Sequence, residues 1–183
     1  MATAIVLIIV GVLTRFLPHP PNFVPLGAIA LYGGARLPRR VALVVTQAVL
    51  VLSDVVIHLG RGIPFSPASQ LTTYATFAAL AAVGGLVPKD AGPLSRLGMA
   101  AVGSSAFFLV SNFAVWAEGS GLGLPRTFAG LAAVYSAGLP FYGNTLAADL
   151  LGTVGLFALD GLLGRLAARL VPARAASPAG VER

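Results

Sequence analysis

The sequence has no cysteine and few charged residues, and each of these absences restricts what the protein can be. Without cysteine, the 183-residue chain can form no disulfide, no thiolate metal site and no cysteine nucleophile. Its two histidines are too few for a conventional multi-histidine metal site, so we expect neither a metal nor a cofactor. Charged residues make up 10% of the chain, whereas soluble domains contain about 25%.

Hydrophobic residues dominate the composition instead. They make up 57% of the chain, and the mean hydropathy is +0.89. This composition predicts an integral membrane protein with a single transmembrane domain, residues 1–171. The net charge of +6 fits loop arginines beside anionic lipid, so we expect membrane lipid and no nucleic acid as a partner. The first apolar run has no basic region before it and no cleavage site, which favours a retained helix over a signal peptide.

Apolar runs predict an all-α fold of about six transmembrane helices in one compact bundle. The runs cover residues 2–17, 23–37, 41–59, 71–87, 97–117 and 142–164. Several are shorter than the roughly 20 residues that an upright helix needs. A weaker helical stretch, residues 127–138, is predicted to end before Pro140 and to lie at the membrane interface or partly in the bilayer.

The distribution of basic residues predicts the orientation of the bundle. With the N-terminus inside, the inner connections and tail carry nine basic residues and the outer loops carry three. By the positive-inside rule, both termini are then cytoplasmic in a multi-pass protein of the cytoplasmic (inner) membrane. Residues 172–183 are small, polar and proline-containing, and are predicted to form a disordered cytoplasmic tail.

Small residues recur at spacings that allow helices to approach closely. Ala75 and Ala79 stand four positions apart in the fourth run. The glycine pairs 33–34 and 84–85 lie within or at the ends of predicted helices. We interpret the alanines as close packing within the bundle, with a dimer face as the alternative, and the glycine pairs as close packing or kinks.

The proline-rich segment, residues 15–25, is the least helix-like part of the membrane domain. It places Arg15, His19 and Asn22 among four prolines. Proline fixes φ and lacks an N–H, so this segment can be neither a helix interior nor a central strand. Polar groups on irregular backbone at the edge of a membrane indicate a binding site or its lid.

Polar residues of the predicted helices fall mostly in the outer half of the bundle. Asp54 and His58 stand four positions apart and therefore share a helix face, and Asn112 and Trp116 do the same. Their convergence predicts an outward-facing pocket with a polar mouth and aromatic walls. The candidate substrate-binding residues are Arg15, His19, Asn22, Asp54, His58, Asn112, Trp116, Tyr135, Asn144 and Asp149.

Each candidate also has a structural alternative. Asp54 and Asp149 can form ion pairs, for example with Arg15, that hold the bundle together. Trp116 and the tyrosines can form an interfacial aromatic belt. His58 can be a histidine whose hydrogen bonds are satisfied at a helix end.

Catalytic motifs are absent from the sequence. It contains no H-E-x-x-H, no G-x-S-x-G, no phosphate loop and no dinucleotide fingerprint. An intramembrane hydrolase needs a nucleophile beside a base, and Ser53 next to Asp54 is too weak a sign of one. We therefore do not expect an enzyme.

Four motifs resemble a family of small, uncharacterised bacterial membrane proteins. They are RFLPHPPNFVPLGAIALYGG (15–34), SD (53–54), SNFAVW (111–116) and GLPFYGNTLAAD (138–149). The resemblance covers the chain up to about residue 166 and implies no function of its own.

The predicted architecture also resembles the S components of energy-coupling-factor (ECF) vitamin transporters. The common features are six helices, cytoplasmic termini and a proline-rich loop after the first helix. The resemblance implies that residues 18–25 form a substrate lid, and that an ECF T component and its ATPases are partners. The family's A-x-x-x-A docking surface is altered, because Ala4 is followed four positions later by Ile8; action without an energising module is therefore the alternative.

Together these features favour a substrate-binding membrane subunit of a vitamin or micronutrient uptake system. It would capture a small molecule from the outer face, close the loop around His19 and release the molecule inward. The alternative is a structural or assembly subunit of a larger membrane complex with no small-molecule substrate. In that case Arg15, Asp54 and Asp149 would form a buried polar clamp, and no cavity would exist.

Overall fold

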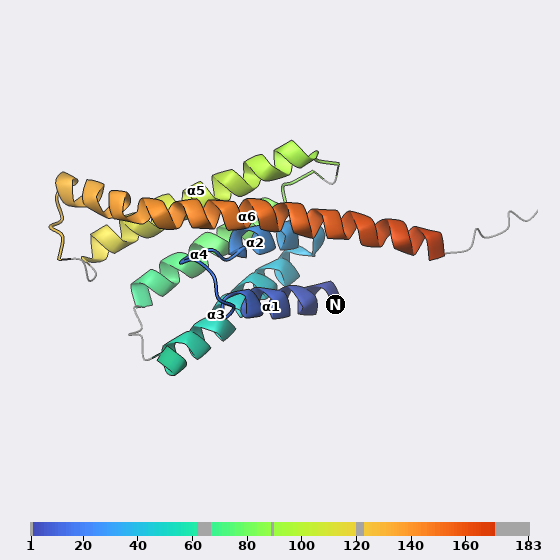
Figure 1. Ribbon diagram of the computed structural model, residues 1–183, viewed down its shortest axis with the longest axis horizontal. Helices are drawn as coiled ribbons and strands as arrows, with labels where there is room; N and C mark the ends of the chain where they lie inside the picture. The colour runs from blue at the N-terminus through green and yellow to red at the C-terminus, as the bar shows by residue number, and fades with distance from the viewer. Residues whose placement is uncertain (1, 62–66, 89, 120–122, 171–183) are drawn as a thin grey trace, which may run out of the picture.

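The computed structural model is mostly helical over the residues that it describes, which are 2–61, 67–88, 90–119 and 123–170 (Figure 1). No strand occurs in these ranges, so the all-α prediction is confirmed for them. The predicted tail, residues 172–183, lies outside the described residues. The helices are α1 (Ala2–Thr14), α2 (Leu26–Arg36), α3 (Arg39–Arg61), α4 (Pro67–Gly84), α5 (Pro93–Glu118) and α6 (Phe128–Leu170).

The lengths of the helices show that the prediction of about six transmembrane helices is wrong. Among the described residues, three helices are long and apolar enough to cross a membrane, namely Arg39–Gly60, Pro93–Glu118 and Phe128–Leu170. The apolar α1 has 13 residues and α2 has 11. Both are short because the proline-rich segment ends the first and delays the second. At 1.5 Å per residue, α2 spans about 16 Å, roughly half of the hydrocarbon core.

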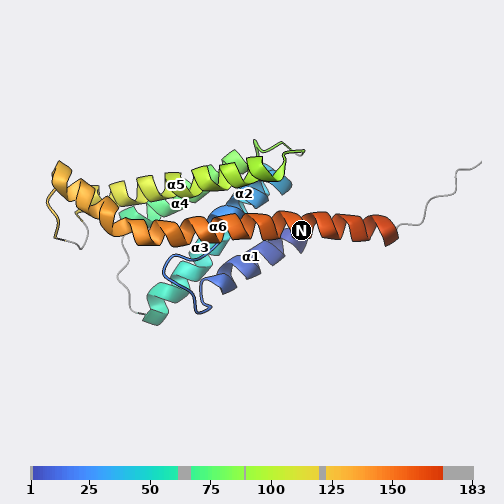
Figure 2. The same ribbon diagram turned by 45° about the horizontal axis from the view of Figure 1, so that its top comes forward.

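The long α6 joins two segments that we predicted to be separate. It runs through Pro140 without interruption, as one helix of 43 residues. Proline removes one backbone hydrogen bond but leaves the turns on either side intact, and α5 packs along α6. The first turns of α6 are inclined to the rest of the helix in Figure 2. A length of about 65 Å is roughly twice the hydrocarbon core, and the C-terminal turns project beyond the other helices (Figures 1 and 2).

The short α2 lies at the centre of the bundle and contacts all five other helices. Residues 27–34 are all buried, as expected of a helix that is apolar on every side. Gly34 and Gly84 permit its close contact with α4. A Cβ on Gly84 would lie 2.5 Å from the carbonyl oxygen of Leu31, and one on Gly34 would overlap the carbonyl oxygen of Ala81. One glycine of each pair therefore permits a close helix contact, as the sequence indicated.

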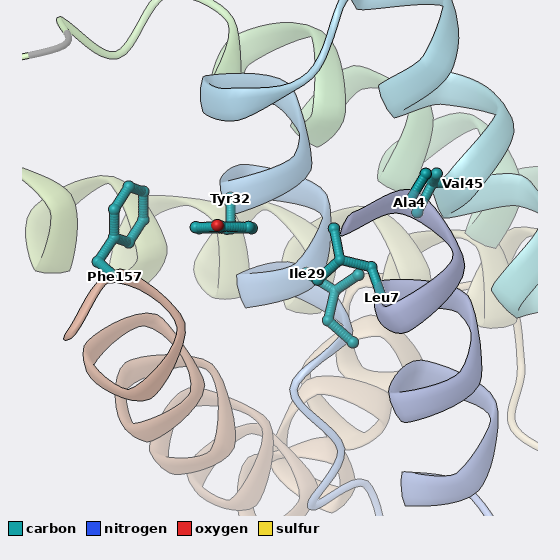
Figure 3. Close-up of a cluster of buried hydrophobic side chains, with 6 residues drawn as sticks. All are labelled: Ala4, Leu7, Ile29, Tyr32, Val45 and Phe157. Carbon is teal, nitrogen blue, oxygen red and sulfur yellow. The ribbon is translucent and has the colours of Figure 1, made fainter. Parts of the chain in front are cut away.

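A buried cluster fixes α1, α3 and α6 around α2 (Figure 3). Its members are Ala4, Leu7, Ile29, Tyr32, Val45 and Phe157. The rings of Tyr32 and Phe157 meet edge to face, with centroids 5.1 Å apart. Tyr32 Oη also donates a hydrogen bond of 3.1 Å to Asp160 Oδ1, and Arg36 Nε lies 2.7 Å from Asp160 Oδ2. These contacts position the C-terminal end of α2 against α6.

Candidate functional site

A cavity of about 330 Å³ lies at the end of the bundle where α1 and α3 end and α2 and α4 begin. We call it the polar cavity. Four of the ten candidate residues line it: Arg15, Asn22, Asp54 and His58. The remaining lining residues are Val24, Leu26, Leu50, Ile57, Gln70, Thr73, Phe77, Phe107 and Thr145. Segments far apart in the sequence therefore build one partly polar chamber.

An ion pair closes one wall of the polar cavity. Arg15 Nη1, just after α1, lies 2.6 Å from Asp54 Oδ1 on α3 and donates a 2.5 Å hydrogen bond to Ser53 Oγ. Tyr74 Oη of α4 donates to Asp54 Oδ2 at 2.9 Å. The side chains of Arg15 and Asp54 keep 20% and 8% of their surface exposed. The opposite charges cancel, so this wall offers strong hydrogen-bonding groups without a net charge.

A second polar contact crosses the cavity wall from α3 to α4. Gln70 Nε2 lies 2.7 Å from His58 Nε2, so the amide donates when that ring nitrogen is unprotonated. Asp54 and His58 are four residues apart on α3, and Gln70 and Tyr74 are four apart on α4. Each helix therefore presents two polar side chains on the face toward the other.

The proline-rich loop is held in place by α6. Asn144 Nδ2 donates a 2.8 Å hydrogen bond to the carbonyl oxygen of Pro21, and Thr145 Oγ1 lies 3.3 Å from that of Asn22. Asn22 adopts φ = 61°, a left-handed conformation that asparagine tolerates better than most residues. His19 does not line the polar cavity, and its Nδ1 lies 2.7 Å from the carbonyl oxygen of Pro20.

Asp149 lies outside the polar cavity and caps the central helix. It is 1% exposed, and its Oδ1 accepts a 3.1 Å hydrogen bond from the backbone N–H of Ala28. Its Oδ2 accepts a 2.7 Å hydrogen bond from Ser104 Oγ. The N-cap residue of α2, Pro25, offers no side-chain cap, and a Cβ on Gly27 would overlap the carboxylate. Asp149 therefore supplies from α6 the acceptor that the N-terminus of α2 lacks.

Three other candidates link α5 to the start of α6. Tyr135 Oη donates to the carbonyl oxygen of Leu109 at 2.7 Å, and Trp116 Nε1 donates to that of Thr127 at 3.2 Å. Asn112 Nδ2 donates to a carbonyl oxygen of its own helix at 2.8 Å. None of the three candidates lines the polar cavity. The aromatic surface of the polar cavity comes instead from Phe77 and Phe107.

Sequence reasoning missed Gln70 and Thr73 of α4, which line the polar cavity, and Tyr74, which donates a hydrogen bond to Asp54. Gln70 and Tyr74 have the same four-residue spacing as Asp54 and His58, and they lie on the next helix along the chain. Two successive antiparallel helices with such pairs near their shared end would be expected to bring the pairs together. That spacing was the available signal.

A larger hollow, with a volume of about 620 Å³, is apolar and lies between α4 and α5. We call it the α4–α5 groove. Ala75 and Ala79 line it together with Gly98, Gly103 and Ala106. The small residues of α4 thus face an open groove as well as the bundle. Within the described residues, no three histidine or acidic side chains gather as a metal site would require.

Comparison with known proteins gives a family match. The family model described as "Family of unknown function (DUF6580)" matches residues 1–172. No curated protein matches the chain. No solved structure matches it either. The resemblance to ECF S components therefore stays a prediction.

Proposed function

We propose that this chain, which belongs to the DUF6580 family of unknown function, captures a small molecule in the polar cavity as part of a micronutrient uptake system. The main support is the cavity itself, because a volume of about 330 Å³ falls at the lower end of the roughly 300–1,000 Å³ typical of ligand pockets. Its converging polar groups on an apolar, aromatic background are also typical of such pockets. In this proposal the chain is embedded in the cytoplasmic membrane with both termini inside, and the cavity faces outward.

The lining favours a neutral or zwitterionic ligand with a flat apolar part. Arg15 and Asp54 present opposite charges a few ångströms apart, so a ligand with both a carboxylate and an N–H group could engage each of them. Phe77 and Phe107 offer ring surfaces that are in contact, with centroids 5.0 Å apart. Many vitamins combine these two features.

The proline-rich loop is suited to act as a lid. Arg15 at its start is paired with Asp54 of α3, whereas Pro21 and Asn22 are bonded to α6. A ligand that replaced the Arg15–Asp54 contact would release the loop from α3 while α6 continued to hold its other end. Binding would thereby shift the loop between two positions, as a capture subunit requires.

Native mass spectrometry of the protein purified in mild detergent tests this proposal. We expect a bound small molecule in the wild type and its loss in His58→Ala and in Asn22→Gly, which keeps the left-handed backbone accessible. Asn112→Ala is the matched control, because Asn112 lies outside the cavity and should retain the ligand. An adduct that survives both cavity variants would refute the proposed site.

Topology can be tested independently because the chain has no native cysteine. A single cysteine at Pro20 should react with a membrane-impermeant maleimide on intact cells. A cysteine at Pro38, which is exposed at the other end of the bundle, should react only after permeabilisation. The reverse pattern would place the polar cavity on the cytoplasmic side and exclude capture from outside.

A second candidate function, assembly of a larger membrane complex, is favoured by the α4–α5 groove. Its small-residue lining would accept a transmembrane helix of a partner, such as an ECF T component. The pairing of Arg15 with Asp54 and the hydrogen bonds of Asp149 to Ala28 and Ser104 also fit a structural clamp. Mass spectra with stoichiometric protein partners and no small-molecule adduct, even after incubation with a panel of vitamins, would favour this alternative.

A further inference from the structure

A second, smaller pocket lies between α5 and α6 at the opposite end of the bundle from the polar cavity. Its volume is about 210 Å³, and we call it the α5–α6 pocket. It is lined by Pro93, Arg96, Leu97, Thr153, Val154, Phe157 and Ala158. The volume is below the roughly 300 Å³ of the smallest typical ligand pockets, so the pocket suits one chemical group of a ligand.

Two polar atoms of this pocket are buried without a hydrogen-bond partner among the described residues. They are Arg96 Nε and Thr153 Oγ1. Thr153 is only 2% exposed. A threonine hydroxyl within a helix usually bonds to the carbonyl oxygen four residues earlier, as those of Thr46 and Thr73 do here. A buried polar group without a partner is costly, so two in one pocket suggest that a ligand completes them.

The charges around the pocket favour an anion. The guanidinium of Arg96 lies 4.4 Å from the centroid of the Phe157 ring. The ring covers one face of the guanidinium, and the N–H groups at the edge of the guanidinium are left for other partners. Arg36 lies near the same ring, at 5.1 Å, but Asp160 neutralises its charge. In the part of the chain that the structure describes, no ion pair is formed by Arg96.

The start of α5 adds to this positive field. Pro93 is in the first turn of the helix and lines the pocket, and the N-cap Gly92 provides no side-chain hydrogen bond. The helix dipole at such a terminus attracts negative groups. The terminus, the guanidinium of Arg96 and the hydroxyl of Thr153 thus converge on one small space.

We propose that the α5–α6 pocket binds a phosphate group, which accepts hydrogen bonds from Arg96 Nε and Thr153 Oγ1. The group can belong to an anionic phospholipid or to free phosphate. Leu97, Val154 and Ala158 line the same pocket and would lie beside the acyl chain of a lipid. On the predicted orientation this end faces the cytoplasmic leaflet, where basic pockets between helices commonly hold anionic headgroups. This site is independent of the polar cavity and of its function.

Lipid titration in native mass spectrometry tests the proposal. The detergent-purified full chain is titrated with phosphatidylglycerol and, separately, with phosphatidylcholine of the same acyl chains. We expect one preferred phosphatidylglycerol per chain, and Arg96→Gln should weaken it at least about tenfold, as expected for losing a charge-assisted hydrogen bond. Arg40→Gln is the matched control, because it removes an exposed charge at the same end of the bundle. Equal losses in both variants would overturn the proposal.

Thr153→Val provides a second test, whose expected result differs from that of a residue with a merely structural role. It removes the unpartnered hydroxyl with little change in shape, so the lipid-free protein should unfold at the same or a higher temperature. The stabilisation that added phosphatidylglycerol gives the wild type should be reduced in this variant. A lower unfolding temperature without lipid, combined with undiminished stabilisation by lipid, would refute the site.

Inorganic phosphate distinguishes the two sources. If millimolar phosphate alone stabilises the wild type, and both Arg96→Gln and Thr153→Val abolish that effect, the ligand is free phosphate. If phosphate has no effect and phosphatidylglycerol does, the ligand is a lipid. If neither gives an effect that depends on Arg96 and Thr153, the pocket binds no phosphate.

Discussion

Asp54 and Asp149 are both buried carboxylates of the membrane domain, yet they have different partners and different surroundings. Asp54 is paired with a cation, Arg15, and borders a cavity. Asp149 has no cation within hydrogen-bond reach among the described residues, and accepts hydrogen bonds from Ala28 and Ser104. Asp54 borders a space that a ligand could enter, whereas Asp149 caps the N-terminus of α2.

The difference shows that burial alone does not mark a binding residue. The two carboxylates differ in whether a backbone N–H group is among their hydrogen-bond donors. Asp149 stabilises the start of α2, whose amides would otherwise be buried without acceptors. Asp54 is bonded to the side chains of Arg15 and Tyr74, which can exchange partners when a ligand binds.

Asp149→Ala should have the largest effect on stability, because it leaves several buried donors without an acceptor. We expect a loss of about 3 kcal/mol in the free energy of unfolding. Thermal unfolding in detergent, followed by size-exclusion chromatography, measures it. Asp149→Asn is the control and should retain most of the stability, since its amide oxygen can still cap α2. Equal behaviour of the two variants would contradict the capping role.

Asp54→Ala should have the next largest effect, about 2 kcal/mol, because Arg15 then lacks its anion but borders a cavity that water can enter. Combining it with Arg15→Ala tests the ion pair in a double-mutant cycle. The double variant should be less destabilised than the sum of the two single variants. Strict additivity would show that the pair contributes nothing.

Asn144→Ala should cost about 1 kcal/mol, the contribution of the hydrogen bond to the carbonyl oxygen of Pro21. The larger consequence is a looser proline-rich loop, so limited proteolysis should cut near Phe23 faster than in the wild type. Ser136→Ala is a suitable control, because the hydroxyl of Ser136 bonds only to its own helix in α6. Unchanged cleavage in Asn144→Ala would mean that α6 does not hold the loop.

Trp116→Phe should have the smallest effect, about 0.5 kcal/mol or less, because the lost hydrogen bond to Thr127 is exposed. It should also leave any ligand in the polar cavity bound, since Trp116 lies outside that cavity. Thermal unfolding and the ligand mass shift are measured on the same sample. Loss of the ligand would place the site at the α5–α6 connection instead.

Part of the polar cavity could be predicted from the sequence. The grouping of Arg15, Asn22, Asp54 and His58 followed from helix spacing and from the alternation of chain direction, both of which are local or regular. Helix spacing and chain direction did not predict that Asn112 lies apart from these four residues. Two residues at the same predicted depth can face different neighbours, because rotation of each helix about its axis is set by packing.

Pro140 and α2 illustrate the same limit in the fold. The sequence correctly indicated helices but placed a break at Pro140, where contact with α5 maintains a continuous α6. It also counted residues 23–37 as a span, whereas the helix has only 11 residues. The assignment was wrong because hydropathy registers how apolar a segment is, and not whether lipid or protein surrounds it.

By itself, the sequence determined the helical, strongly apolar character of this protein and the irregular loop that precedes α2, because composition, proline geometry and helix periodicity act locally. Only the tertiary structure decided which polar residues meet. It assigned Asp149 to the N-terminus of α2, placed Arg15 against Asp54, and left Arg96 and Thr153 facing a pocket without partners of their own. Those outcomes depend on contacts between residues many positions apart, and such contacts are fixed only when the helices pack.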